Sequence, residues 1–262
     1  MLQNLLGLKG DLSKNLLKLE FDTFKGCELG EVVCHSFNRV AKSYARYCRV
    51  QDQIISQLLS HLAGRSYARV LDLGCGSGNV IKQFPRFNLS AHEFIGIDIC
   101  LEMLTEHPQS IEGVQKVSLI CADFENILLS PCDLIIASSS LQWAKQLESL
   151  CIRLCLQSTN IALAIHTNKS LHALHAFLGT KSPLRSQEQT KAILERSLNK
   201  FKYKMWTQHF TQHFQNRQEL LQQLKFGGLL GGGGLSYAQK KALKQIPLKT
   251  LDYEVVFCIA QR

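Results

Sequence analysis

Short apolar runs alternate with segments of helical spacing over residues 69–165, and this alternation predicts the fold. Strands buried on both faces of a sheet read as nearly continuous apolar runs, whereas amphipathic helices repeat apolar residues every three or four positions. We therefore predict a doubly wound α/β fold with a parallel sheet, whose ligands gather at the carboxyl ends of the strands. The predicted parallel strands are 70–73, 94–98, 117–124, 132–138 and 161–165.

Two further strands are predicted at 202–211 and 253–260. In the second of them, Tyr253, Val255, Phe257 and Ile259 alternate with other residues, which suits a final antiparallel strand. The prediction is a seven-stranded sheet with its last strand antiparallel. Helical insertions at about 168–200 and 212–250 are expected to form a cap above the active site.

The chain before the first strand divides into two parts. Residues 37–62 have apolar side chains at helical spacing. Residues 1–35 form an N-terminal extension whose role the sequence does not indicate, ahead of a single domain over 36–262. A glycine-rich segment at 226–234, with six glycines in nine residues, predicts a flexible connection within the cap.

The turn after the first strand carries the clearest chemical signal. Asp72 is followed by Gly74, Gly76 and Gly78 at alternate positions. A dinucleotide site requires the spacing G-x-G-x-x-G, which this turn does not have. The pattern D-x-G-x-G-x-G resembles motif I of the class I S-adenosylmethionine-dependent methyltransferases. An unpaired carboxylate is costly inside a strand, and the resemblance supplies a partner for Asp72, the ammonium end of the cofactor.

The later strand ends extend this resemblance. Asp98 lies 20 residues after Gly78, where the family pairs an acid with the ribose hydroxyls, and Asp123-Phe124 occupies the adenine position. Taken singly, Asp98 or Asp123 also suits a helix N-cap, and Cys75 suits packing within the turn. The resemblance implies a Rossmann-like class I methyltransferase fold, S-adenosylmethionine as cofactor and no metal. The cofactor-binding residues that it implies are Asp72, Gly74, Cys75, Gly76, Gly78, Asp98, Ile99, Met103, Asp123, Phe124 and Ser138.

Two other segments narrow the family. The pattern F-x-R-x-A-x-x-Y at 37–44 and Leu141-Gln142-Trp143 after the fourth strand resemble the malonyl-acyl-carrier-protein O-methyltransferases of the biotin pathway. The resemblance implies methyl transfer to the free carboxylate of malonyl-acyl carrier protein or malonyl-coenzyme A. Arg39 would bind the carboxylate, Tyr44 would donate a hydrogen bond, and Trp143 would wall the methyl channel. A surface ion pair for Arg39 and core packing for Tyr44 and Trp143 are the alternatives.

The charge of the chain bears on its partner. The net charge is +9, and residues 181–204 hold seven basic residues against two acidic ones. Residues 240–249 add Lys240, Lys241, Lys244 and Lys249 without any acid. We expect these segments to dock an acidic carrier protein. A merely solvated face is the alternative, and RNA is disfavoured because no aromatic residues interleave with the charges.

Other activities remain open at this point. The chain would also suit a methyltransferase for a small free acid of the aconitate type, an RNA methyltransferase, or a non-catalytic S-adenosylmethionine-binding regulator. No apolar run is long enough to span a membrane. The ten cysteines are scattered without metal-binding spacing, which favours reduced thiols and a cytoplasmic location.

Overall fold

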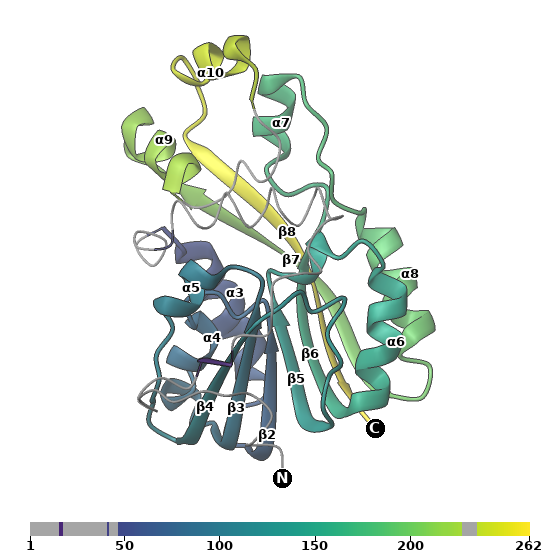
Figure 1. The fold of residues 1–262 in the computed structure, drawn as a ribbon. Helices are drawn as coiled ribbons and strands as arrows, with labels where there is room; N and C mark the ends of the chain where they lie inside the picture. The colour runs from purple at the N-terminus through teal and green to yellow at the C-terminus, as the bar shows by residue number, and fades with distance from the viewer. Residues whose placement is uncertain (1–15, 18–40, 42–46, 227–234) are drawn as a thin grey trace.

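A computed structural model describes residues 16–17, 41, 47–226 and 235–262, and they form an α/β structure around one mixed sheet (Figure 1). The strand order is β1-β4-β3-β2-β5-β6-β8-β7. β2 to β6 run parallel, and β8 runs antiparallel to both of its neighbours. The strands are β1 (Leu16–Leu17), β2 (Ser66–Leu73), β3 (Ser90–Asp98), β4 (Val114–Cys121), β5 (Cys132–Ser138), β6 (Ser158–His166), β7 (Lys202–His213) and β8 (Thr250–Gln261).

All seven predicted strands are present, and the predicted antiparallel last strand is confirmed. The sheet also gains β1, which pairs two residues of the N-terminal extension with the outer edge of β4. β2 lies between β3 and β5, so the chain order reverses beside it. In open α/β sheets this reversal marks the crevice where ligands bind.

Helices cover both faces of the sheet. On one face, α3 packs apolar side chains such as Ile54 and Leu58 into the same cluster as Val70 of β2. On the other face, Leu150 of α6 and Leu194 of α8 join a cluster with Leu71. The helices are α3 (Arg49–Ser60), α4 (Asn79–Lys82), α5 (Leu101–Thr105), α6 (Leu147–Gln157), α7 (His172–Leu178), α8 (Gln187–Ser197), α9 (Arg217–Phe226) and α10 (Tyr237–Leu243), with short 3₁₀ turns at Pro85–Phe87 and Leu141–Trp143.

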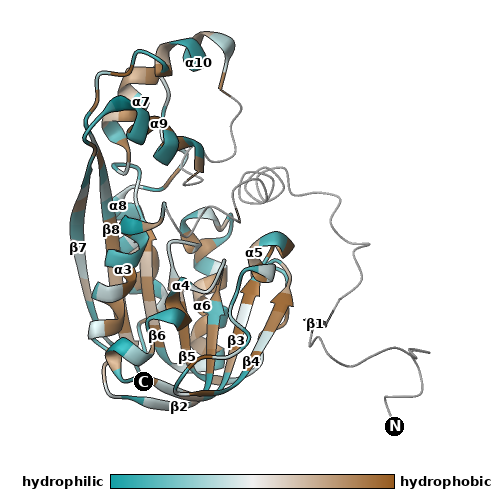
Figure 2. Cartoon of the chain, turned by 90° about the vertical axis from the view of Figure 1, so that its left-hand side faces the viewer, coloured by the Kyte–Doolittle hydropathy of each residue, from teal (hydrophilic) through white to brown (hydrophobic). Residues whose placement is uncertain are grey.

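The helices of the two predicted insertions lie in different places. α7, α9 and α10 stand beyond the carboxyl ends of the parallel strands in both views (Figures 1 and 2). α8 instead lies beside α6, where Leu194 and Leu198 are buried against the sheet. The segment 168–200 therefore supplies one helix above the strand ends and one helix to the layer that flanks the sheet.

The helical region predicted at 37–62 is described at Ala41, which is helical, and from residue 47 onwards, and the rest of it lies outside the described residues. α3 begins at Arg49, and Tyr47 and Cys48 lie outside it. The side-chain amide of Gln223 on α9 donates a hydrogen bond to the Tyr47 carbonyl at 2.7 Å, so this carbonyl is bound by α9. No helix in the described ranges is long and apolar enough to cross a membrane.

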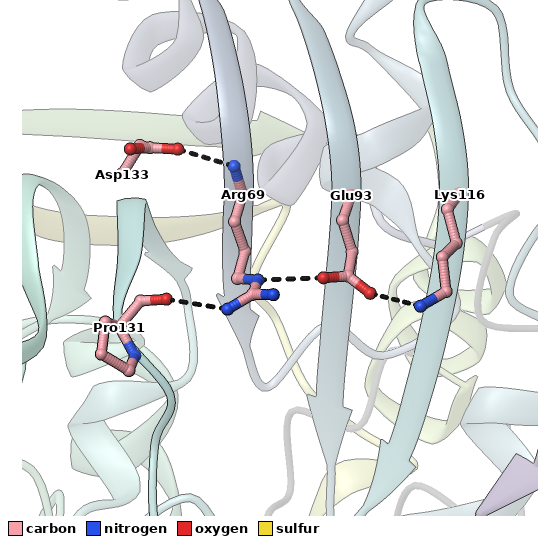
Figure 3. Close-up of polar contacts among 5 residues, drawn as sticks. All are labelled: Arg69, Glu93, Lys116, Pro131 and Asp133. Carbon is pink, nitrogen blue, oxygen red and sulfur yellow. Dashed lines mark hydrogen bonds and ion pairs between the residues drawn. The ribbon is translucent and has the colours of Figure 1, made fainter.

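A charged ladder crosses three neighbouring strands near their amino ends (Figure 3). Glu93 of β3 accepts hydrogen bonds from Arg69 of β2 at 2.9 Å and from Lys116 of β4 at 2.6 Å. The three residues are directly opposite one another in the sheet register. The Lys116 hydrogen bond is the main cause that lowers the pKa of the Glu93 carboxyl. Glu93 thereby links β2, β3 and β4 in their observed register.

We expect Glu93→Gln to lower the free energy of unfolding by roughly 1 kcal/mol at pH 7, because two cross-strand charge pairs lose their anion. Because folding lowers the pKa of Glu93, this stabilisation is fully present at pH values above the unfolded-state pKa of about 4.3. It disappears as the pH falls through the folded-state pKa. Urea unfolding at pH 7 and pH 3 measures the difference. Glu112→Gln, at an exposed position before β4, is the control. An undiminished difference at pH 3 would contradict the assignment.

Candidate functional site

The glycine turn forms a close-fitting surface at the carboxyl end of β2. Gly74, Gly76 and Gly78 have φ values of +71°, +53° and +81°, which residues with a side chain rarely adopt. The turn is also tightly covered. A Cβ atom at Gly78 would lie 2.8 Å from a carbon of His107, and one at Gly76 would lie 3.2 Å from Met103. Glycine is therefore required by the backbone conformation and by the packing.

Hydrogen bonds fix this turn to the end of β3. The amides of Gly74 and Cys75 donate to the Ile97 carbonyl at 2.7 and 3.1 Å. One carboxylate oxygen of Asp98 accepts the Gly76 amide at 2.8 Å, and the other accepts the Cys100 amide at 2.8 Å. Burial raises the pKa of Asp98, and these backbone hydrogen bonds act in the opposite direction. Asp98 thus binds the turn itself and retains lone pairs for a ligand.

Asp72 is the least satisfied group of the site. Its side chain is 1% exposed, and neither carboxylate oxygen has a hydrogen-bond partner among the described residues. Burial, followed by the negative charge of Asp98, raises the pKa of Asp72 well above its usual range. A cation bound at the turn would relieve both causes. The positively charged amino end of S-adenosylmethionine has this chemistry, so the residues present fit the cofactor that the sequence predicts.

The remaining predicted cofactor residues have mixed surroundings. Met103 is buried over Gly76, and the Cys75 thiol packs below Gly96, which has no room for a Cβ. Ile99 directly follows β3, and its carbonyl accepts a hydrogen bond from the Cys121 thiol at 3.7 Å. Met103 and Cys75 therefore pack at the glycine turn, and their contact with the cofactor stays a prediction.

Asp123 and Phe124 show local roles. The two Asp123 carboxylate oxygens accept the Glu125 amide and the Asn126 side-chain amide, each at 2.8 Å. Phe124 packs against the apolar cluster of the α6 face. These contacts close a turn between β4 and β5 in which no helix begins, so Asp123 is not a helix N-cap, and the adenine contact stays a prediction.

The end of β5 carries the predicted acceptor side. Ser138 is the last residue of β5, and its buried hydroxyl has no hydrogen-bond partner among the described residues. Trp143 is half-buried on the 3₁₀ turn that follows. Arg39 and Tyr44 lie outside the described residues, as does most of the glycine-rich segment.

Several residues that contact this site carried no signal in the sequence. Ser140 packs against Gly74, where a Cβ would collide with it, and its hydroxyl donates to the Leu73 carbonyl at 2.5 Å. His107 covers Gly78, and burial lowers its pKa to about 4. Ser139 has a φ of +60° and lies 3.2 Å from Nε2 of His166. Each position depends on tertiary packing, which no local pattern encodes.

Comparisons with known proteins agree with this geometry. Residues 70–155 match a family model described as a methyltransferase domain. The malonyl-[acyl-carrier protein] O-methyltransferase of Bacillus cereus is 33% identical over 123 residues, covering 44% of each chain. The protein of the same name from Haemophilus influenzae is 26% identical over 218 residues, which cover 78% of this chain and 80% of the relative. The chain thus spans less than half the length of the first relatives that it matches.

Solved structures show the same fold. The YcgJ protein of Bacillus subtilis covers 80% of this chain and 98% of its own, with a TM-score of 0.58 and 13% identity. The plantazolicin methyltransferase BpumL, solved in complex with SAH, covers 90% of this chain and 96% of its own, with a TM-score of 0.53 and 15% identity. The predicted Rossmann-like class I fold is confirmed, and residues 70–155 are similar to methyltransferase domains.

We expect Asp72→Asn to stabilise the ligand-free chain and to weaken binding of S-adenosylhomocysteine by ~10–100-fold, because a bond to a charged group is lost. The raised pKa of Asp72 makes folding of the parent chain less favourable as pH rises above its unfolded-state value of about 3.9. The gain in melting temperature should therefore be larger at pH 8 than at pH 5.

Thermal unfolding at the two pH values and isothermal titration with S-adenosylhomocysteine measure these effects. Asp252→Asn, which changes an exposed carboxyl on β8, is the matched control and should leave the ligand affinity unchanged. An Asp72→Asn variant that binds the ligand as tightly as the parent chain would refute the role of this carboxylate.

Proposed function

We propose that this chain, which carries a methyltransferase domain in a class I methyltransferase fold, methylates the free carboxylate of a malonyl thioester. The acceptor would be malonyl-acyl carrier protein or malonyl-coenzyme A, and the reaction would be an early step of biotin synthesis. The observation that carries methyl transfer is the buried Asp72 carboxylate beside the glycine turn, which has no hydrogen-bond partner among the described residues. The names of the relatives from three genera support the malonyl acceptor.

The chemistry asks the protein for position and for exclusion of water. S-adenosylmethionine, when bound, supplies a methyl group on a positively charged sulfur. An ordinary carboxyl group, with a pKa of about 4, is already ionised at neutral pH and needs no general base. Alignment of carboxylate, methyl group and sulfur in one line can contribute ~7–11 kcal/mol. The glycine turn, which lies between Asp72 and Asp98, is suited to hold the cofactor in this alignment.

The charge state of the strand ends supports an anionic acceptor beside a cationic donor. Burial lowers the pKa of His166 to about 4, so this side chain is neutral at pH 7. A neutral ring at the end of β6 adds no positive charge that would repel the sulfonium. Arg39 and Tyr44 remain our proposed carboxylate-binding pair, and Trp143 our proposed wall of the methyl channel.

We assign carrier docking to the basic surface of α10. Lys240, Lys241 and Lys244 are exposed there, beyond the carboxyl ends of the parallel strands (Figure 1). The other basic segment is less suited, because Arg196 pairs with Glu148 and the guanidinium of Arg185 donates to the Ala144 carbonyl.

The register also separates the two basic segments. Lys202 pairs with Gln261, which in turn pairs with Asn160 near the start of β6. Lys202 therefore lies at the amino end of β6, opposite to α10. This end of the molecule provides a control surface of the same charge.

We further propose a cytoplasmic location, because acyl carrier proteins and reduced thiols would be met there.

Product analysis separates the candidate activities. The purified chain is incubated with methyl-labelled S-adenosylmethionine and, in parallel, malonyl-acyl carrier protein, malonyl-coenzyme A, an aconitate-type acid or RNA. We expect an alkali-labile methyl ester on the malonyl thioesters alone. Transfer to the free acid or to RNA would replace the proposal by that activity. Tight cofactor binding without transfer to any acceptor would favour a regulator.

Neutralising Lys240, Lys241 and Lys244 to glutamine should raise KM for malonyl-acyl carrier protein roughly tenfold at low salt and leave KM for malonyl-coenzyme A unchanged. The reason is that exposed charges steer a large acidic partner more than a small one. Steady-state kinetics at two salt concentrations test this. The same change at Lys200, Lys202 and Lys204 is the control. Equal losses on both acceptors, or in both variants, would contradict docking on α10.

A further inference from the structure

Buried polar side chains form a row along one face of the sheet, at the carboxyl ends of β2, β5 and β6 and beside them near the amino end of the antiparallel β8. The register pairs Asp72 of β2 with Ile136 of β5, and Ser138 of β5 with Ala164 of β6. Alternation then places the row on the α3 face, because Val70, Ile136, Ala164 and Val255 all belong to the α3-side cluster. This polar row consists of Asp72, Ser138, His166 and Tyr253.

Tyr253 ends the row with an unsatisfied donor. Its side chain is 2% exposed, and its hydroxyl has no hydrogen-bond partner among the described residues. Its ring lies against His166, with centroids 5.9 Å apart. A buried hydroxyl without a partner is costly, so a structural role alone would be better served by phenylalanine. The hydroxyl is therefore suited to a ligand.

His166 cannot serve as that partner in the observed arrangement. The Ser170 hydroxyl donates to the Glu254 carbonyl at 3.0 Å and accepts the Glu254 amide at 3.1 Å. Its single hydrogen is used, so Nδ1 of His166, at 3.2 Å, must donate to Ser170. Nε2 of His166 then accepts from the Ser139 hydroxyl at 3.2 Å. Both ring nitrogens are occupied, so the Tyr253 hydroxyl has no acceptor within the part of the chain that the structure describes.

The strand order tells which ligand the Tyr253 hydroxyl would meet. Asp98, which binds the glycine turn, is on β3, on one side of β2. Tyr253 is on β8, on the other side of β2. β8 is three strands from β2, which corresponds to about 14 Å at about 4.8 Å per strand. A cofactor held between Asp72 and Asp98 extends away from Tyr253. The far end of the polar row is thus left for a second molecule, the methyl acceptor.

We propose that the Tyr253 hydroxyl donates a hydrogen bond to the acceptor carboxylate and so selects a malonyl group over an uncharged acyl group. This inference rests on the proposed function and adds to it a specificity residue on the last strand. His166, held by Ser170 and Ser139, supports the Tyr253 ring and fixes the direction of its hydroxyl.

The test removes the one hydroxyl. Tyr253→Phe should weaken binding of malonyl-coenzyme A by ~10–100-fold, as expected for a hydrogen bond to a charged group. Binding is measured by isothermal titration in the presence of S-adenosylhomocysteine, so that no turnover is needed. Acetyl-coenzyme A, which lacks the carboxylate, should bind the variant and the parent chain equally. The affinity for S-adenosylhomocysteine and the melting temperature should not fall.

Tyr67→Phe is the matched control, because Tyr67 is also a buried tyrosine on the α3 face but stands at the amino end of β2. It should leave both affinities unchanged. Unaltered malonyl-coenzyme A binding by Tyr253→Phe would overturn the inference, as would an equal loss for acetyl-coenzyme A. The proposed function fails separately, when the parent chain methylates no malonyl thioester. If the parent chain binds malonyl-coenzyme A no better than acetyl-coenzyme A, the inference fails, whereas the proposed function is still decided by methylation of a malonyl thioester.

Discussion

The site is organised around two carboxylates at the point where the strand order reverses, the buried Asp72 and the half-buried Asp98. Asp72 and Asp98 end neighbouring strands, and burial raises the pKa of both. Asp98 is partly compensated by the amides of the glycine turn, whereas Asp72 has no hydrogen-bond partner within the described part of the chain. The folded chain therefore places two acidic side chains together with too little positive charge beside them. Binding of a cationic ligand relieves this deficit, which couples ligand affinity to the stability of the turn.

The glycine turn contacts several elements around it, so ligand binding at the turn also bears on their packing. Its backbone is held by the Ile97 carbonyl and by Asp98, and its outer surface is covered by Met103 and His107 on and after α5. Displacement of the turn would break contacts with β3, with α5 and with Ser140 together. Closely packed protein interiors do not deform gradually. The turn is therefore a preformed cradle.

Much of the fold could be predicted from the sequence because its signals are local. A buried parallel strand is an apolar run, and a left-handed turn requires glycine, so the seven strands and the turn at 74–78 follow from short segments. The position of α8 could not be predicted in this way. Its apolar face suits a cap or a flanking layer equally, and only packing of Leu194 against the α6-side cluster decides between them.

The acceptor side of the site depends on contacts between distant parts of the chain. His166 and Tyr253 are 87 positions apart, and they meet because β8 inserts antiparallel beside β6. In the sequence, Tyr253 is one of several alternating apolar residues of the same strand as Phe257. What sets Tyr253 apart is its place in the fold, at the edge of the sheet where the parallel strands end. The glycine turn is therefore encoded by one continuous segment, whereas the polar row proposed for the acceptor is assembled across strands. Relatives that share the loop can differ in acceptor through changes at β6, β8 and the helices above them.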